Sequence, residues 1–231
     1  MPEQPKINWR TPKLYFFYFL VFTIIVLIIF SYIIGGAFWK YWAQNKSIEE
    51  YYRQRALELT QIVPQIYPND PLKGEVGAKA TVIVYSDFTC PACQDFTPDL
   101  QSLEKLYGNQ VQFVFKGLPL SGLPESRPAL VAAYCANEQN KFWEYHDLLF
   151  SDPTALNQQK YREYANTLGL DLTSFNQCLS NKKYDSMLTR NLSDALSLQI
   201  DSIPSVYING QKIEGFLNIE TLKNLINQKL K

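Results

Sequence analysis

The stretch "TVIVYSDFTCPACQDF", residues 81–96, decides how the rest of the chain is interpreted. It opens with β-branched and apolar residues of the kind that form a strand buried on both faces of a sheet. The residues after Pro91 carry apolar positions at helical spacing and stop at Gly108. Cys90 and Cys93 therefore lie where a strand gives way to a helix.

That location favours redox chemistry for the two cysteines. The unpaired N–H groups and the dipole of the first helical turn favour negative charge on Cys90, which lowers its pKa. Pro91 suits this turn because no N–H is needed there. Cys93, one turn later, is close enough to attack a mixed disulfide formed on Cys90. We expect Cys90 to be the attacking thiol and Cys93 the resolving thiol.

Two other uses of a Cys-x-x-Cys pair compete with this one. A structural zinc site needs four Cys or His ligands in paired spacing, whereas Cys135 and Cys178 are isolated from each other and His146 is the one histidine. A purely structural disulfide has little to hold together at a helix start. We therefore expect neither a metal nor an organic cofactor, and we interpret His146, within "FWEYHDLLF", as a structural residue.

The segments after this stretch predict an α/β domain with a helical insertion. A second strand over 111–120 follows the first helix, and the order strand, helix, strand implies a parallel pair. From 125 to about 200 the pattern is helical. "PSVYING" and "QKIEG" then predict a hairpin turning at Asn209-Gly210, and an amphipathic helix closes the chain.

The N-terminal part contains a candidate membrane anchor. Residues 14–34 carry no charge and are enough to span a bilayer, with Trp and Tyr residues on both flanks. A cleaved signal peptide is the alternative, although the apolar run exceeds the usual length of about 7 to 15. We expect an anchor over 14–38, a juxtamembrane helix at 45–63 and a linker at 68–80. The anchor and the main domain, 70–231, are then separated by residues 39–69.

Charge says little about partners or orientation. The chain has 22 basic and 22 acidic side chains and no basic tract, so we expect no nucleic-acid partner. Basic residues flank both ends of the span in similar numbers, so the positive-inside rule does not orient it.

Three motifs together carry a family resemblance. The first stretch, "AAYCANEQNKFWEYHDLLF" (132–150) and "IDSIPSVYINGQKIEGF" (200–216) resemble the DsbA-like branch of thioredoxin-fold thiol-disulfide oxidoreductases. The resemblance covers roughly residues 70–229. It implies a thioredoxin fold with a helical insertion, preceded here by one transmembrane helix.

The resemblance also implies an arrangement of the site. Cys90 would be exposed and Cys93 buried, with Pro91 and Ala92 between them. A cis Pro204 would face the cysteines and align an extended substrate strand, and Ile203 would help to select redox partners.

Two positions depart from the family's usual pattern. Val84, six positions before Cys90, stands where an acidic residue commonly takes a proton from the resolving thiol. Asp87 matches an aspartate of the common pattern and is not assigned that role. Ala92 stands where stronger oxidants carry a histidine, so we expect a milder couple.

The remaining cysteines bear on localisation. Once Cys90 pairs with Cys93, one pairing is left for Cys135 and Cys178, and we expect them to form a structural disulfide rather than to remain two buried free thiols. Because disulfides persist in oxidising compartments, a bridge would put the main domain outside the cytoplasm, on the periplasmic or extracellular side, and residues 1–13 inside.

The expected function is a membrane-anchored extracytoplasmic thiol-disulfide oxidoreductase. Its partners would be protein thiols and disulfides, a membrane or extracytoplasmic redox partner and, through residues 14–34, the lipid bilayer. We favour the oxidase direction over the reductase direction. The alternatives are a non-catalytic thioredoxin-like binding module and a carrier that holds copper or zinc on the two thiolates.

Overall fold

The computed structural model describes residues 11–60, 63–213 and 218–231. The chain divides into two units, Met1–Gln61 and Ile62–Lys231, which are described separately. Three of the segments expected from the sequence lie partly outside the described residues: positions 1–10 of the N-terminal segment, positions 61–62 of the juxtamembrane helix, and positions 214–215 at the end of the hairpin.

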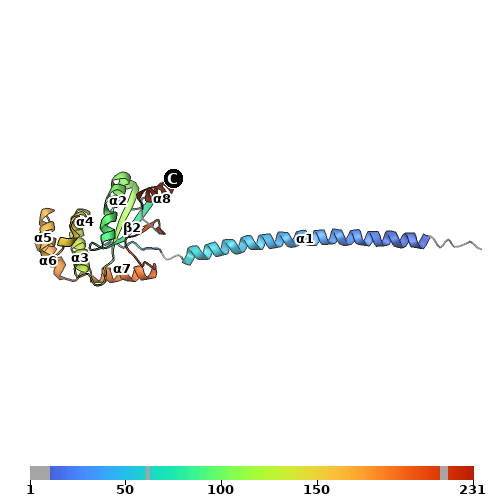
Figure 1. The fold of residues 1–231 in the computed structure, drawn as a ribbon, viewed down its shortest axis with the longest axis horizontal. Helices are drawn as coiled ribbons and strands as arrows, with labels where there is room; N and C mark the ends of the chain where they lie inside the picture. Colours follow the sequence, from blue (N-terminus) through green and yellow to red (C-terminus); the bar gives the residue numbers. More distant parts are fainter. Residues whose placement is uncertain (1–10, 61–62, 214–217) are drawn as a thin grey trace, which may run out of the picture. The chain divides into compact units, whose positions relative to one another are not determined.

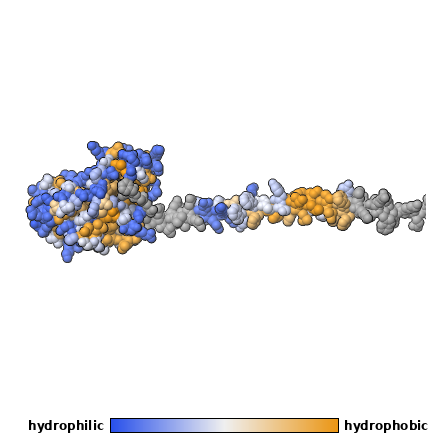
Figure 2. Space-filling model, in the orientation of Figure 1, coloured by the Kyte–Doolittle hydropathy of each residue, from blue (hydrophilic) through white to orange (hydrophobic). Residues whose placement is uncertain are grey.

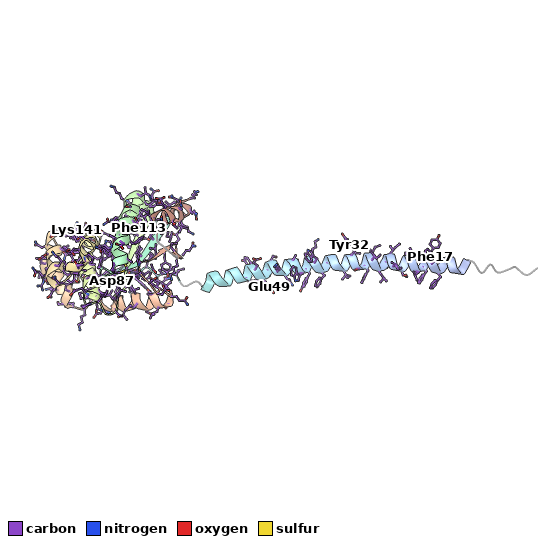
Figure 3. All side chains as sticks on the ribbon, viewed as in Figure 1. Phe17, Tyr32, Glu49, Asp87, Phe113 and Lys141 are labelled. Carbon is purple, nitrogen blue, oxygen red and sulfur yellow. A yellow bond between two sulfur atoms is a disulfide. The ribbon has the colours of Figure 1, made fainter. Side chains whose placement is uncertain are left out.

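The first unit contains one long helix, α1, Thr11–Thr60 (Figure 1). Its apolar side chains point outward, and Phe17 and Tyr32 are 62% and 84% exposed (Figure 3). Among the described residues, Phe16–Tyr52 contains the one helical stretch long and apolar enough to cross a membrane, which Figure 2 shows as a continuous apolar band.

The juxtamembrane helix expected at 45–63 is not a separate element. It is continuous with the apolar span in α1, which ends at Thr60. Gly35 and Gly36 are the weakest helix formers between the two parts, and each costs only about 1 kcal/mol relative to alanine. That cost is too small to end a helix whose flanking residues propagate it.

The second unit is built on a five-stranded sheet with the order β1-β3-β2-β4-β5. The strands are β1 Leu72–Lys73, β2 Ala80–Ser86, β3 Val111–Gly117, β4 Ser205–Ile208 and β5 Gln211–Ile213. Only β2 and β3 pair in parallel, and the other three pairs are antiparallel. The predicted parallel crossover is confirmed, and α2, Pro91–Tyr107, makes the connection.

The predicted hairpin is also present between β4 and β5. Asn209 and Gly210 both have positive φ, 48° and 81°. A two-residue turn of this kind needs positive φ at both central positions, which asparagine and glycine tolerate best.

Helices cover both faces of the sheet. On one face α2 and α8, Ile219–Leu230, bury an apolar core with β2, β3 and β4. On the other face lie Tyr85, Val114 and Tyr207, with residues that follow α7, Asp185–Ser197. The predicted helical insertion is confirmed: it comprises α3 Ser126–Asn137, α4 Phe142–Ser151, α5 Gln158–Thr167, α6 Leu172–Ser180 and α7, with a short 3₁₀ turn, η2 Pro153–Ala155.

The stretch expected to be a linker, 68–80, belongs partly to the folded unit. It contains β1, and Asp70 within it is buried and forms a salt bridge with Lys116, with 2.5 Å between Asp70 Oδ2 and Lys116 Nζ. The backbone N–H of Phe115 also donates to the carbonyl of Pro71. These partners lie far away in sequence, so the local composition of turn residues gave no sign of them.

Candidate active site

The two cysteines lie at the start of α2, directly after β2. Cys90 is the N-cap residue, and its sulfur accepts a hydrogen bond from the backbone N–H of Cys93 at 3.3 Å. Pro91 occupies the first helical turn. The carbonyl of Cys90 accepts from the N–H of Gln94, which continues the helix. The sulfur of Cys90 therefore satisfies one of the donors that every helix start leaves unpaired.

The reactive end of this motif is more enclosed than the resemblance implied. Cys93 is buried, as expected, at 1% exposure, but Cys90 is only 6% exposed. The cause is the loop before β4, since the carbonyl oxygen of Ile203 lies 3.7 Å from the Cys90 sulfur. Pro91 and Ala92 are exposed, and they form the accessible rim beside the sulfur.

The Ile203–Pro204 peptide bond is cis. It directly precedes β4, which pairs with β2, the strand that leads to the cysteines. This pairing brings Ile203 to Cys90 across 113 positions of sequence. The structure thus brings Cys90, Cys93, Ile203 and Pro204 together at one end of the sheet.

The two thiols differ in their tendency to ionise. A hydrogen bond from the Cys93 thiol, aided by the backbone N–H groups of Cys93 and Ala92, lowers the pKa of Cys90 to about 7, against the opposing effects of burial and Asp87. The pKa of Cys93 is raised, first by its hydrogen bond to Cys90 and then by burial. At neutral pH the proton therefore stays on Cys93, and Cys90 is the thiol that ionises.

Asp87, three positions before Cys90, is buried, and both of its carboxylate oxygens accept hydrogen bonds. One accepts from the N–H and the hydroxyl of Thr89, and the other accepts from the Ser126 hydroxyl at 2.6 Å. Ser126 in turn accepts from the N–H of Leu120 at 2.8 Å. Asp87 therefore ties the turn before Cys90 to the segment after β3.

Ser86 is a site residue that sequence reasoning missed. It is 4% exposed, and its hydroxyl lies close enough to the Cys93 thiol to lower the pKa of that thiol, against the larger effects of Cys90 and burial. Val84, by contrast, is buried in the apolar core with Phe96 and Leu100 and has no polar atom to offer. Strand alternation was the available signal, because positions 84 and 86 share one face of β2 and position 86 lies closer to the cysteines.

His146 lies inside an aromatic cluster. It is 1% exposed, and its ring is 4.9 Å from that of Phe150 and 5.6 Å from that of Phe88, between ring centroids. Its Nδ1 atom is 2.9 Å from the carboxylate of Asp147. These contacts fit the structural role expected from the sequence.

Cys135 and Cys178 form a disulfide in the insertion, and the pair is separate from the Cys90 motif. It joins α3 to α6, with 5.7 Å between the two Cα atoms. Both residues are buried within the core of the insertion. Cys90 and Cys93 are free thiols in this structure.

Solved structures share this architecture. The catalytic domain of ScsC from Proteus mirabilis superposes with a TM-score of 0.64 at 21% identity, covering 76% of this chain and 97% of that one. BdbD from Bacillus subtilis, in its oxidised form, superposes with a TM-score of 0.65 at 22% identity, covering 73% of this chain and 96% of that one. The thiol-disulfide exchange protein alpha-DsbA2 from Wolbachia pipientis superposes with a TM-score of 0.65 at 16% identity, covering 80% of this chain and 97% of that one. The fold is therefore DsbA-like.

The curated relatives are much longer proteins. "Na(+)/H(+) antiporter NhaA 3" of Salinispora tropica is 33% identical over 162 residues, which are 70% of this chain and 25% of that protein. "Na(+)/H(+) antiporter NhaA" of Herminiimonas arsenicoxydans is 25% identical over 201 residues, which are 86% of this chain and 31% of that protein. The chain thus spans between a quarter and a third of the length of these relatives.

A family model described as Thioredoxin matches residues 67–228. The match includes the whole sheet, the two cysteines, the helical insertion and the cis-proline loop. It begins at residue 67 and so includes the whole stretch expected to be a linker (68–80), in agreement with the burial of Asp70. The chain belongs to the thioredoxin family, with a DsbA-like fold.

Proposed function

We propose that this protein is a membrane-anchored thiol-disulfide oxidoreductase that exchanges disulfides with protein substrates through Cys90 and Cys93. The observation that carries the proposal is the asymmetry of the pair. Cys90 caps α2 and has a pKa lowered to about 7, while Cys93 is buried with a raised pKa. A nucleophilic thiol and a resolving thiol need this difference.

In the oxidising direction the reaction starts from a Cys90–Cys93 disulfide. A substrate thiolate attacks the Cys90 sulfur, the Cys90–Cys93 bond breaks, and Cys93 leaves as a thiolate that takes up a proton. A second substrate thiolate then attacks the substrate sulfur bound to Cys90, and Cys90 leaves as a thiolate. The substrate loses two electrons and gains a disulfide, and the protein ends with two reduced cysteines.

The pKa of Cys90, lowered to about 7, makes the disulfide more oxidising than an unperturbed pair, but it equals the value of about 7 in thioredoxin and lies above the about 3.5 of a strong oxidant, in line with a mild couple. Hydrogen bonds that stabilise the Cys90 thiolate stabilise the reduced protein, and stabilising the reduced form makes a disulfide a stronger oxidant. Reduction of substrates is the same reaction in reverse and remains the second candidate.

In many family members an acidic residue at the position of Val84 interacts with the resolving thiol, and here Ser86 provides the polar group next to that thiol. Its hydroxyl lowers the pKa of the Cys93 thiol, which favours the thiolate that forms when Cys93 leaves. Ser86 is thus a positioning residue for the resolving thiol, since the substrate reacts at Cys90.

The proposal includes an extracytoplasmic location for the catalytic domain. The Cys135–Cys178 disulfide supports it, because such bonds persist in oxidising compartments. The apolar stretch of α1 supports a single-pass anchor. Tethering would raise the effective concentration of the domain near a membrane redox partner or near emerging protein substrates. Sodium/proton antiport is not proposed, because the chain spans only a fraction of the relatives that carry that name.

The test is the reduction potential of the Cys90–Cys93 couple in the full chain, equilibrated against glutathione in detergent. We expect a reversible two-electron couple that is less oxidising than the about −120 mV of a strong periplasmic oxidant and lies above the about −270 mV of thioredoxin. A value near the lower figure would make the protein a reductase. The lack of any reversible couple would favour the binding module, and stoichiometric copper or zinc on the reduced protein would favour the metal carrier.

A further inference from the structure

The turn that leads into the active-site helix contains a buried carboxylate. Asp87 is 0% exposed, and its backbone carbonyl accepts a hydrogen bond from the N–H of Cys90 at 3.2 Å. A turn closed by such a bond places its first and fourth Cα atoms within about 7 Å of each other. The backbone N–H of Asp87 also acts on the second thiol, since it is one of the groups that oppose the rise in the pKa of Cys93. Asp87 is therefore close to both cysteines.

The donors that hold this carboxylate are all neutral. Thr89 donates to one oxygen through its N–H and its hydroxyl, and Ser126 donates to the other oxygen at 2.6 Å. Within the part of the chain that the structure describes, no lysine, arginine or histidine forms a salt bridge with Asp87. Hydrogen bonds from neutral groups stabilise a carboxylate without cancelling its charge. The turn before Cys90 thus keeps a negative charge.

The surroundings of Cys90 supply no compensating positive charge. The segments that meet around it are residues 87–95, 118–126, 150–153 and 200–204, and none of them contains lysine, arginine or histidine. His146 packs against Phe88, but its Nδ1 atom is 2.9 Å from the carboxylate of Asp147. The other carboxylates of these segments are those of Asp95, Glu125, Asp152 and Asp201, which are exposed or half-buried. Water and salt screen exposed charges, so Asp87 is the carboxylate whose field is least weakened.

A negative charge beside Cys90 affects one redox state more than the other. In the oxidised protein the Cys90 sulfur is bonded to the Cys93 sulfur and is uncharged. Reduction adds two electrons, and above the pKa of Cys90 one proton goes to Cys93 while Cys90 remains a thiolate. Like charges in a poorly hydrated turn repel each other. The Cys93 thiol is the main group that lowers the pKa of Cys90, and Asp87 opposes it.

We propose that the buried Asp87 carboxylate limits the oxidising strength of the Cys90–Cys93 couple by destabilising negative charge on the Cys90 sulfur. The proposal rests on the proposed oxidoreductase function, because it concerns the same two thiols. It adds the group that keeps the couple mild, and so it bears on the direction of electron transfer. Asp87 acts through Cys90 and is a positioning residue.

The test compares the full-length wild-type protein with Asp87→Asn, both in detergent. Asparagine has nearly the same size, and its amide oxygen can accept the bonds from Thr89, so the charge is the main change. Each protein is equilibrated with reduced and oxidised glutathione on either side of the Cys90 pKa of about 7, at about pH 5 and about pH 9. Acid quenching and alkylation then give the fraction that holds the Cys90–Cys93 disulfide.

At the higher pH, Asp87→Asn should be the stronger oxidant. Its equilibrium constant for oxidising glutathione should be about three- to tenfold larger, which corresponds to about 15–30 mV at about 29.6 mV per tenfold change. At about pH 5 the reduced Cys90 is protonated in both proteins, so the carboxylate has no thiolate to repel and the constants should agree within about twofold. The midpoint for alkylation of Cys90 should also fall. A merely loosened turn would change the constant at both pH values.

Three further variants separate charge from structure, and circular dichroism checks the fold of each. Asp95→Asn is the matched control, because it removes the same charge from an exposed position of α2, five residues after Cys90; its constants should stay within about twofold of wild type. Asp87→Ala is a second neutral variant and should show the same pH-dependent rise, with lower thermal stability. Asp87→Glu keeps the charge and should remain near wild type.

The possible results distinguish this proposal from the proposed function. Equal constants for the wild type and Asp87→Asn at the higher pH would overturn the role of Asp87. A rise in Asp87→Ala without one in Asp87→Asn would do the same, because the hydrogen bonds would then be responsible. If the wild-type protein shows no reversible couple with glutathione at either pH, the oxidoreductase function itself fails.

Discussion

The two faces of the sheet bury different kinds of side chain. The face toward α2 and α8 is covered by apolar side chains, among them Val82, Phe113 and Leu103. The face toward α7 holds Tyr85 and Tyr207 together with buried charged groups. The first face is stabilised by the burial and close packing of apolar side chains, whereas the second also depends on specific ion pairs and hydrogen bonds.

The charged groups on the α7 side converge on Asp70. Its Oδ2 atom lies 2.5 Å from the Nζ atom of Lys116, and the side chains of both residues are fully buried. The same oxygen accepts from the backbone N–H of Tyr67 at 2.8 Å. The guanidinium of Arg190 lies 3.7 Å from the centre of the Tyr67 ring. The segment before β1 is therefore held to β3 by the Asp70–Lys116 ion pair and to α7 by the cation–π contact between Arg190 and Tyr67.

This comparison shows what each face requires of the sequence. Aliphatic residues of similar volume can replace one another on the α2 side at small cost. On the α7 side, removal of one partner leaves a buried charge. Burial lowers the pKa of Lys116, and the carboxylates of Asp70 and Asp194 oppose that shift and favour the ammonium form. The polar face is thus the more sensitive to single changes.

The largest effect should come from breaking the buried ion pair. Lys116→Met leaves the Asp70 carboxylate buried without its partner, which should lower the free energy of unfolding by about 3–5 kcal/mol. Urea titration of the full chain in detergent, followed by tryptophan fluorescence, measures the change. Adding Asp70→Asn to Lys116→Met should restore most of the loss. If the double variant is no more stable than the single one, the interpretation of this face is wrong.

On the apolar face, a substitution that leaves a cavity should lower the free energy of unfolding somewhat less than loss of the ion pair does. Leu103 is 1% exposed in the core between α2 and the sheet, so Leu103→Ala should lower the free energy of unfolding by about 2–5 kcal/mol. Leu103→Met keeps the volume and should cost less than about 1.5 kcal/mol. The same titration measures both. Equal losses for alanine and methionine would show that this face also depends on exact partners.

The active-site thiols lie where β2 leaves the sheet, and their protonation should follow pH. In the reduced protein, alkylation of Cys90 should be half-maximal near pH 7, since its pKa is lowered from 9.0 to about 7. Because the folded pKa is below the unfolded one, the reduced protein should gain stability as pH rises from 7 to 9.

Cys93→Ala tests the cause of this shift. It removes the thiol hydrogen bond and should move the alkylation midpoint toward 9.0, while Cys93→Ser keeps a donor and should move it less. An unchanged midpoint in Cys93→Ala would assign the shift to the backbone N–H groups instead.

The smallest effect should come from Ser86. Ser86→Ala removes the hydroxyl that lowers the pKa of Cys93, an effect we set at that of one hydrogen bond, about 0.5–1.5 kcal/mol. Resolution of a mixed disulfide should therefore slow about two- to tenfold, and its pH profile should move upward. Ser86→Thr should restore the rate, and Ser102→Ala, on the exposed side of α2, serves as the control. A slower rate with an unshifted pH profile would make Ser86 merely structural.

Local pattern was enough to predict much of this protein. The apolar run of α1, the strand that leads into Cys90, the parallel crossover, the helical insertion and the Asn209-Gly210 hairpin all follow from periodicity and turn chemistry within short windows. These features depend on neighbours a few positions apart, which the sequence displays directly.

Tertiary structure alone decided the features that join distant segments. Ile203 covers Cys90 across 113 positions, and Asp70 in an expected linker pairs with Lys116 on β3. Ser86 acquires its role because α2 folds back over β2 and brings Cys93 to its hydroxyl. Contacts of this kind form only after the sheet has brought the segments together, so no local window of sequence contains them.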